Sequence, residues 1–109
     1  MKKVYKYPVI FAVEDRETEE GDFPVFIIIP DLMDAGFKFA LSGGHTEDDI
    51  IAIASDCMKI AIEEGLRSDL QIPLSSNLRD IDVKRHLALY DEEEIEIKSI
   101  AIEWIKAEV

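Results

Sequence analysis

The alternation of apolar and polar positions is clearest at the start of the chain. From Val4 to Val13 every second side chain is aromatic or branched, so one face carries Tyr5, Tyr7, Val9, Phe11 and Val13. Alternation with a period of two is typical of a β-strand. Pro8 lies within this strand and favours a strand edge or an irregular point, because proline cannot donate a ladder hydrogen bond.

Two further strands are predicted after an acidic hairpin loop. Residues 14–22 hold six carboxylates and end near Gly21, which is typical of an exposed loop. Residues 23–29 are almost continuously apolar, which predicts a strand buried on both faces that ends at Pro30-Asp31. After a turn over residues 32–36, the alternation in residues 37–42 predicts a third strand with Phe37, Phe39 and Leu41 facing inward.

A long helix is predicted from Thr46 to about Glu64. Gly43 and Gly44 interrupt the strand pattern, Thr46 offers an N-cap hydroxyl, and residues 47–49 place three carboxylates in the first turn, where the helix dipole favours them. Gly65 is placed to end the helix. The apolar face is wider than a surface helix needs, so one flank remains for the tail of the same chain, for an oligomer or for a partner.

The last third of the chain has a weaker pattern. Residues 72–77 indicate a loop, and residues 81–90 fit either a short helix or irregular structure. Residues 94–105 alternate with a change of phase at Lys98-Ser99, which predicts a strand with a β-bulge; a helix from Ile100 is the alternative. The predicted fold class is therefore α+β, a three-stranded antiparallel meander followed by one long helix and a fourth C-terminal strand (β-β-β-α-β).

Composition and charge narrow the function. The 109 residues are 48% apolar, which fits a single folded domain over residues 1–109. No apolar run approaches the roughly 20 residues that cross a bilayer, and no secretion signal is recognised, so we expect a cytoplasmic protein without a membrane partner. The formal net charge of −12 argues against direct nucleic acid binding by this chain.

Candidate chemistry is sparse. His45 and His86 are far apart and no metal-ligand spacing is present, so we expect no metal and no cofactor, and a structural or surface role for both histidines. Cys57, the one cysteine, is expected to be a small buried hydrophobe. Acidic pairs such as Asp48 and Asp49 are expected to be solvated surface groups, and no catalytic residue is predicted.

Several short motifs, in this order and spacing, resemble the HicB family of bacterial antitoxins. They are Tyr7-Pro8 with Phe11, Gly21-Asp22-Phe23, Ile29-Pro30-Asp31-Leu32, the segment from Gly44 to Ile50, and Ile72-Pro73-Leu74-Ser75. The resemblance implies a partial ribonuclease H-like fold without catalytic activity. It also implies a partner, a small basic HicA-like toxin that cleaves messenger RNA. Many family members carry an additional C-terminal DNA-binding domain, which we do not expect here.

The resemblance leads to a set of candidate contact residues at the strand-end loops and the helix start. They are Asp22, Phe23, Pro30, Asp31, Asp34, Glu47 and Asp48. The alternative is a non-catalytic module that binds a regulator or assembles as a homo-oligomer through the helix flank around Ile51, Met58 and Ile62. A nuclease is a third hypothesis, disfavoured because residues 4–13 contain no carboxylate to hold metal ions.

Overall fold

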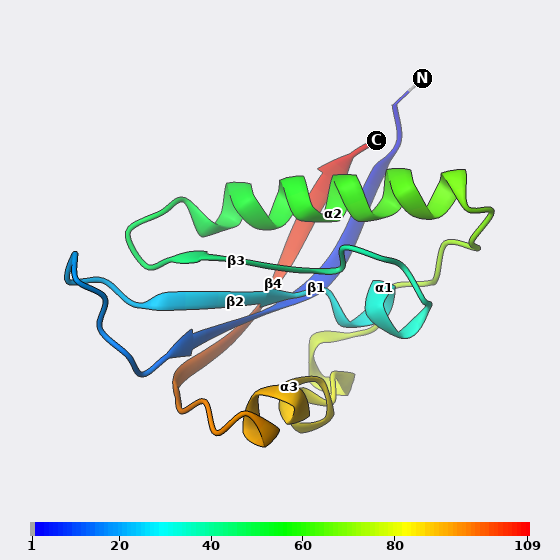
Figure 1. The fold of residues 1–109 in the computed structure, drawn as a ribbon. Coiled ribbons are helices and arrows are strands. Elements are labelled where there is room, and N and C mark those ends of the chain that lie inside the picture. Colours follow the sequence, from blue (N-terminus) through cyan, green and yellow to red (C-terminus); the bar gives the residue numbers. More distant parts are fainter. Residues whose placement is uncertain (1) are drawn as a thin grey trace.

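The fold is an antiparallel sheet with a helix on each face. The computed structural model describes residues 2–109, and within them four strands pair in the order β3-β2-β1-β4. Their bounds are Val4–Glu14 (β1), Pro24–Ile28 (β2), Leu41–His45 (β3) and Ile97–Glu108 (β4). Figure 1 shows α2 (Ile50–Arg67) on one face and α3 (Val83–Glu92) on the other. The predicted α+β class, with a meander, one long helix and a fourth strand, is confirmed.

The central strand β1 contributes to two separate cores. Its Val9 and Phe11 belong to the apolar cluster under α2, and its Ile10 and Ala12 belong to the cluster under α3. Because a strand directs successive side chains to opposite faces, a strand covered by helices on both sides must be apolar at nearly every position. The uninterrupted apolar run from Tyr7 to Val13 reflects this burial.

Pro8 does not mark an edge strand, since β1 lies between β2 and β4. However, β2 pairs only with residues 10–13 of β1. The carbonyl oxygen of Lys6 accepts a hydrogen bond from Ser75 Oγ (2.9 Å). The backbone groups of Lys6 therefore point away from β4. Pro8 lies two residues further on and presents its nitrogen to the same side, where its missing N–H costs no ladder bond.

The third strand begins later than predicted. Residues 37–40 form a turn in which Phe39 adopts a φ of 65°, and β3 covers Leu41–His45, so Gly43 and Gly44 continue the strand instead of interrupting it. Phe37 is buried as expected. Phe39 and Leu41 are exposed, which corrects the expectation that they face inward. The left-handed turn at Phe39 shifts the strand and changes which side chains reach the core.

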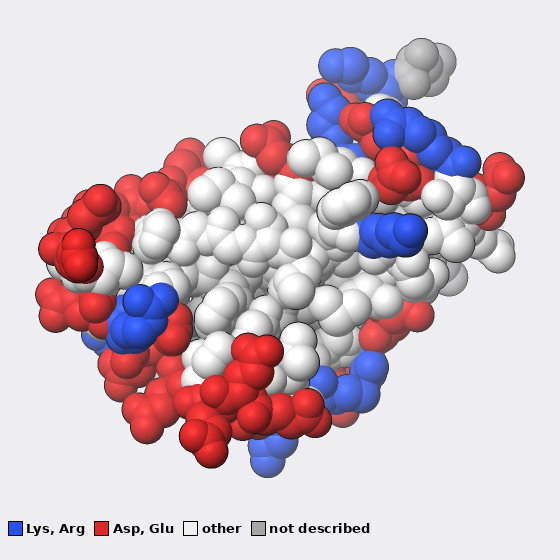
Figure 2. All heavy atoms as spheres, in the orientation of Figure 1, with Lys and Arg blue, Asp and Glu red and all other residues white. Residues whose placement is uncertain are grey.

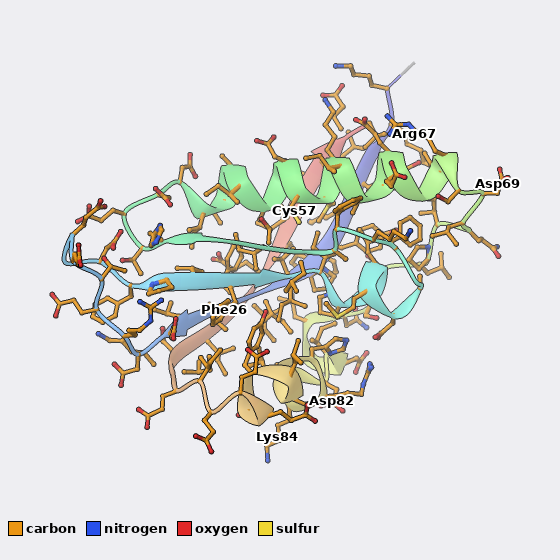
Figure 3. The ribbon with its side chains drawn as sticks, in the orientation of Figure 1. Phe26, Cys57, Arg67, Asp69, Asp82 and Lys84 are labelled. Atoms are coloured by element: carbon orange, nitrogen blue, oxygen red, sulfur yellow. The ribbon has the colours of Figure 1, made fainter. Side chains whose placement is uncertain are left out.

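Helix α2 is displaced by about one turn from its predicted bounds. Asp49 is its N-cap, with Oδ1 accepting from Ala52 N–H (3.1 Å), whereas the Thr46 hydroxyl accepts from Phe23 N–H (3.1 Å). Glu47 and Asp48 therefore precede the helix, and its first turn contains no acidic residue. Gly65 does not end the helix, which continues to Arg67; Ser68 is the C-cap and Asp69 follows it (Figure 3).

The tail of the chain covers much of α2. Ile105 and Ala107 of β4 join the core cluster under this helix, and Ser55 Oγ donates to the carbonyl oxygen of Lys106 (2.7 Å). Met58 and Ile62 are fully buried. Two of the three residues expected to form a free flank for self-assembly are thus core residues, and Ile51 alone of the three is exposed.

The structure decides between the alternatives that the sequence left open for the last third of the chain. A short helix α1 (Pro30–Asp34) replaces part of the predicted turn, and a 3-10 turn η1 (Leu78–Asp80) leads into α3, so the helical alternative for residues 81–90 is confirmed. In β4, Ser99 pairs with Val13 and Ile97 with Glu14, which leaves Lys98 as the extra residue of the predicted bulge. The alternative helix from Ile100 is wrong. Within residues 2–109 no helix is long and apolar enough to cross a membrane.

Candidate partner-binding surface

Two of the seven candidate residues, Asp22 and Phe23, stabilise the acidic hairpin and its contact with β4. Asp22 is buried and accepts a hydrogen bond from Thr18 Oγ1, which closes the loop between β1 and β2. Phe23 is partly buried, and the Nζ atom of Lys98 lies 3.7 Å from the centre of its ring. A cation over an aromatic face is attracted to it, so this contact joins the hairpin to the bulge in β4.

Pro30 and Asp31 form the start of α1 and fix the loop after α2. Pro30 is buried at the first helical position, where its missing N–H is harmless. The Asp31 carboxylate accepts from Ser76 N–H (2.8 Å) and from Ser76 Oγ (2.7 Å). The Tyr7 hydroxyl donates to the carbonyl oxygen of Pro73 (2.6 Å), and burial, followed by the nearby Asp31 carboxylate, raises the pKa of Tyr7 to about 12. The loop of residues 72–77 is therefore fixed near its start, at Pro73, and near its end, at Ser76.

Glu47 and Asp48 lie in the exposed turn between β3 and α2. The Oδ2 atom of Asp48 accepts from His45 N–H (2.9 Å) and lies 3.6 Å from Nδ1 of the same histidine. Glu47 is exposed. Both carboxylates are accessible at one end of β3.

Asp34 lies at the other end of β3, in a polar cluster with α3. Its carboxylate accepts two hydrogen bonds from Arg85, at 3.0 and 2.7 Å, and lies 3.1 Å from Nε2 of His86. Hydrogen bonding from Arg85, aided by His86, lowers the pKa of Asp34. His86 is buried, with Nδ1 2.7 Å from the carbonyl oxygen of Asp82, so its expected structural role is confirmed.

This cluster forms one wall of a groove between α3 and the β3 edge of the sheet. The groove has a volume of about 300 Å³ and is mostly apolar; it is lined by Ile28, Met33, Asp34, Leu41, Arg85, His86, Leu89 and Tyr90. Tyr90 stacks on Phe26 with ring centres 4.3 Å apart, and Phe26 extends from β2 toward α3 (Figure 3). The groove exists because α3 covers β1 and β2 but leaves the α3-facing side of β3 open.

Acidic groups border this apolar surface. Figure 2 shows an uncharged, hollowed band between α2 and α3, with carboxylates gathered at the end that carries the β1–β2 hairpin and over α3, and with lysine or arginine side chains beside the opposite end. The sequence places six carboxylates in residues 14–22 and four in residues 91–94. Such a field attracts basic partners and repels phosphate.

The sequence prediction missed the α3 side of this groove. Of the seven candidates, the structure brings only Asp34 into it. The helix could have been recognised from the i, i+4, i+7 spacing of Val83, Leu87 and Tyr90 after Asp82, whose Oδ1 caps the helix by accepting from Arg85 N–H (3.1 Å). The ion pair that joins this helix to Asp34, 51 residues earlier, has no local signal.

Metal-ligating side chains are not clustered in the part of the chain that the structure describes. Residues 2–109 contain no group of three or more His, Cys, Asp or Glu side chains placed to hold a metal ion. Cys57 is buried on the sheet side of α2 (Figure 3), and burial raises the pKa of its thiol to about 11. The interpretation of Cys57 as a core residue is confirmed.

The fold is that of a chain known from toxin–antitoxin biology. No family model and no curated protein matches this sequence. Among solved structures, the "Toxin-Antitoxin complex from Streptococcus pneumoniae" contains a chain with the same fold, with a TM-score of 0.70 at 19% sequence identity. The match covers 96% of the present chain and 69% of the other. At this identity the likeness shows a shared fold.

Proposed function

We propose that this chain is a HicB-like antitoxin domain that binds a HicA-like, messenger-RNA-cleaving toxin and neutralises it by protein–protein contact. The observation that carries the proposal is the shared fold, over 96% of the chain, with a component of a toxin–antitoxin complex. The motifs from Tyr7 to Ser75 that resemble the HicB family support the choice of antitoxin. Their positions agree with ordered structural roles, since Asp31 and Ser76 are hydrogen-bonded.

Charge supports the same choice. A toxin that binds RNA is expected to be basic, and a net charge of −12 accelerates encounter with a basic protein. Residues 4–13 of β1 carry no carboxylate. The next carboxylate along the strand, that of Glu14, accepts a hydrogen bond from Arg16 Nε (3.2 Å). We therefore assign no catalytic residue, metal or cofactor to the proposed function.

The seven candidate residues divide into two groups under this proposal. Asp34, Glu47 and Asp48 are accessible carboxylates at the two ends of β3 and are proposed to contact the toxin directly. The other four, Asp22, Phe23, Pro30 and Asp31, are proposed to hold the strand-end loops in the shape that the toxin recognises.

The test is co-expression with a HicA-like toxin, for which a short basic reading frame directly beside this gene would be the first candidate. We expect the wild-type chain to restore growth, and the purified chain to stop RNA cleavage by the toxin when the two are mixed in equal amounts. The association rate with a catalytically inactive toxin should fall as ionic strength rises, because salt screens the attraction. Absence of both rescue and binding would refute the proposal.

A matched pair of variants tests whether the carboxylates of the hairpin act through long-range attraction or through direct contact with the toxin. Glu19→Gln/Glu20→Gln neutralises two exposed carboxylates of the hairpin, near the acidic end of the groove, whereas Glu103→Gln/Glu108→Gln removes the same charge from β4 at the opposite edge of the sheet. We expect the hairpin variant to associate more slowly, the β4 variant to associate nearly as fast as the wild type, and both to dissociate at the wild-type rate.

A further inference from the structure

The outer edge of β3 has free backbone hydrogen-bonding groups. Next to the start of β3, Ile29 N–H donates to the carbonyl oxygen of Ala40 (2.9 Å), which fixes the alternation of the ladder with β2. Ser42 therefore points its N–H and C=O toward β2, and Leu41 and Gly43 point theirs away from the sheet. Among residues 2–109, no group donates to or accepts from these outward-facing groups of Leu41 and Gly43.

The edge is closed at its far end. His45 also faces outward, but its N–H donates to Asp48 Oδ2 (2.9 Å) and its carbonyl oxygen accepts from Asp48 N–H (2.9 Å). The open part of β3 is thus a short segment that offers two N–H and two C=O groups. An open, unprotected edge of this kind is a template for pairing with another strand.

Two grooves flank this open segment, and Leu41 lines both. The groove on the α3 side is the one described above, of about 300 Å³. The groove on the α2 side has a volume of about 180 Å³ and is lined by Phe39, Leu41, Ser42, Cys57 and Ile60. Because successive side chains of a strand point to opposite faces, a strand added to β3 would direct its side chains alternately into the two grooves.

The side chains around the edge are apolar and exposed. Phe39 is 58% exposed, Leu41 44%, Leu89 54% and Ile60 55%. We call these four residues the edge patch. They come from the turn before β3, from β3 and from both helices, so the patch surrounds the open strand. Large apolar groups clustered on a surface mark interaction sites, and burial of this patch would favour an added strand.

Charge selects the kind of strand that fits. A second copy of this chain would bring another −12 against the acidic borders of the patch, whereas a basic segment would be attracted to them (Figure 2). Inside the α3-side groove, Arg85 is already paired with Asp34. The carboxylates around the groove therefore remain available to basic groups of a partner. We propose that the β3 edge and its two grooves receive an extended segment of the toxin, with apolar and basic side chains, as an added antiparallel or parallel strand. This inference rests on the proposed function.

The decisive variant removes one outward N–H. Gly43→Pro eliminates the donor and places its ring on the outer side of β3, while the ladder with β2, made by Ser42 and Gly44, is left intact. A Cβ at residue 43 would lie 3.3 Å from the carbonyl oxygen of Val25, so Gly43→Ala is the matched control that adds the Cβ and keeps the N–H. Both variants are first compared with the wild type by thermal unfolding.

A second pair of variants tests the patch. Leu89→Glu adds a carboxylate to the α3-side groove, and Leu66→Glu makes the same change at a leucine of α2 that is 45% exposed and lines neither groove. The ligand is the catalytically inactive toxin, and Kd is measured by calorimetry. We expect Gly43→Pro and Leu89→Glu to weaken binding by at least about tenfold, and Gly43→Ala and Leu66→Glu to change Kd less than about threefold.

Hydrogen exchange gives a readout that does not depend on mutation. In the free protein the Leu41 and Gly43 amides should exchange quickly and those of Ser42 and Gly44 slowly; in the complex all four should be protected. The inference is overturned if the wild type neutralises and binds the toxin but the Leu41 and Gly43 amides stay unprotected and Gly43→Pro binds like Gly43→Ala. That result leaves the proposed function intact, whereas a wild type that does not bind the toxin refutes both. A wild-type dimer that Gly43→Pro dissociates would assign the edge to a second copy and also overturn the inference.

Discussion

Gly65 should be a position where alanine destabilises a helix. In the middle of an exposed helix, replacing glycine by alanine stabilises by about 1 kcal/mol, because glycine loses more backbone entropy on folding. Here a Cβ would lie 2.2 Å from Cε2 and 2.3 Å from Cδ2 of the Phe37 ring. Carbon atoms in van der Waals contact are separated by about 3.5–4.0 Å, so the ring would have to move by more than about 1 Å.

Phe37 has little space for that movement, because it is only 5% exposed and belongs to the core under α2. Overpacking a core costs about 1–3 kcal/mol, and the gain in helix propensity of about 1 kcal/mol offsets part of it. We therefore expect Gly65→Ala to lower the free energy of unfolding by up to about 2 kcal/mol. The total for a domain of this size is about 5–15 kcal/mol, so the loss is measurable without preventing folding.

The assay is urea unfolding followed by circular dichroism, in two backgrounds. In Phe37→Ala, which itself costs about 3–5 kcal/mol, the ring is gone and Gly65→Ala should become stabilising by up to about 1 kcal/mol. The sign reversal distinguishes a steric effect of the ring from a general intolerance of the helix. If Gly65→Ala raises the unfolding free energy in the wild-type background, the close approach of α2 to Phe37 is not what requires glycine.

Three further predictions concern the loops around the sheet. Asp69 has a φ of 59° after α2, so Asp69→Gly should raise the unfolding free energy by about 0.5–1 kcal/mol, and Asp69→Ala, which removes the same charge, should not. Asp31→Ala removes both hydrogen bonds from Ser76 and should cost about 1–3 kcal/mol, with faster proteolysis of residues 72–77. Arg85 is the main cause of the lowered pKa of Asp34 in the folded protein. The ionised Asp34 carboxylate therefore stabilises the fold above its unfolded pKa of about 3.9, and this stabilisation is lost as pH falls through the lower pKa of the folded state. Between about pH 5 and 2, the unfolding free energy of Asp34→Asn, measured in urea, should fall less than that of the wild type.

Period-two patterns predicted the strands well where both faces were buried. The β1 range was predicted correctly, and the bulge at Lys98 was found from its change of phase, because a single extra residue in a strand inverts the apolar positions that follow. In residues 37–42 the same rule failed. There the alternation of Phe37, Phe39 and Leu41 crosses a left-handed turn, and a pattern of side chains does not record the backbone conformation between them.

Helix boundaries depended on contacts that lie far away in the sequence. Thr46 has the residue type of an N-cap, but its hydroxyl is bonded to Phe23, so Asp49 caps the helix. At the other end, Gly65 was predicted to end the helix, but the left-handed residue is Asp69, and Leu70 N–H donates to the carbonyl oxygen of Gly65 (2.9 Å). The groove was harder to predict still, since its walls come from α1, β3 and α3 and meet only through the fold.

The placement of the first strand at the centre of the sheet has a consequence for how the molecule is made. β1 pairs with β4 from Val4 opposite Glu108 to Glu14 opposite Ile97, so the longest ladder joins the first and last strands of the fold. Contacts this distant in sequence are slow to form, because a long loop must close first. A growing chain therefore holds its most apolar strand with one side unpaired until residues 97–108 have left the ribosome, and loss of the end of β4, which carries Ile105 and Ala107, should expose the core under α2.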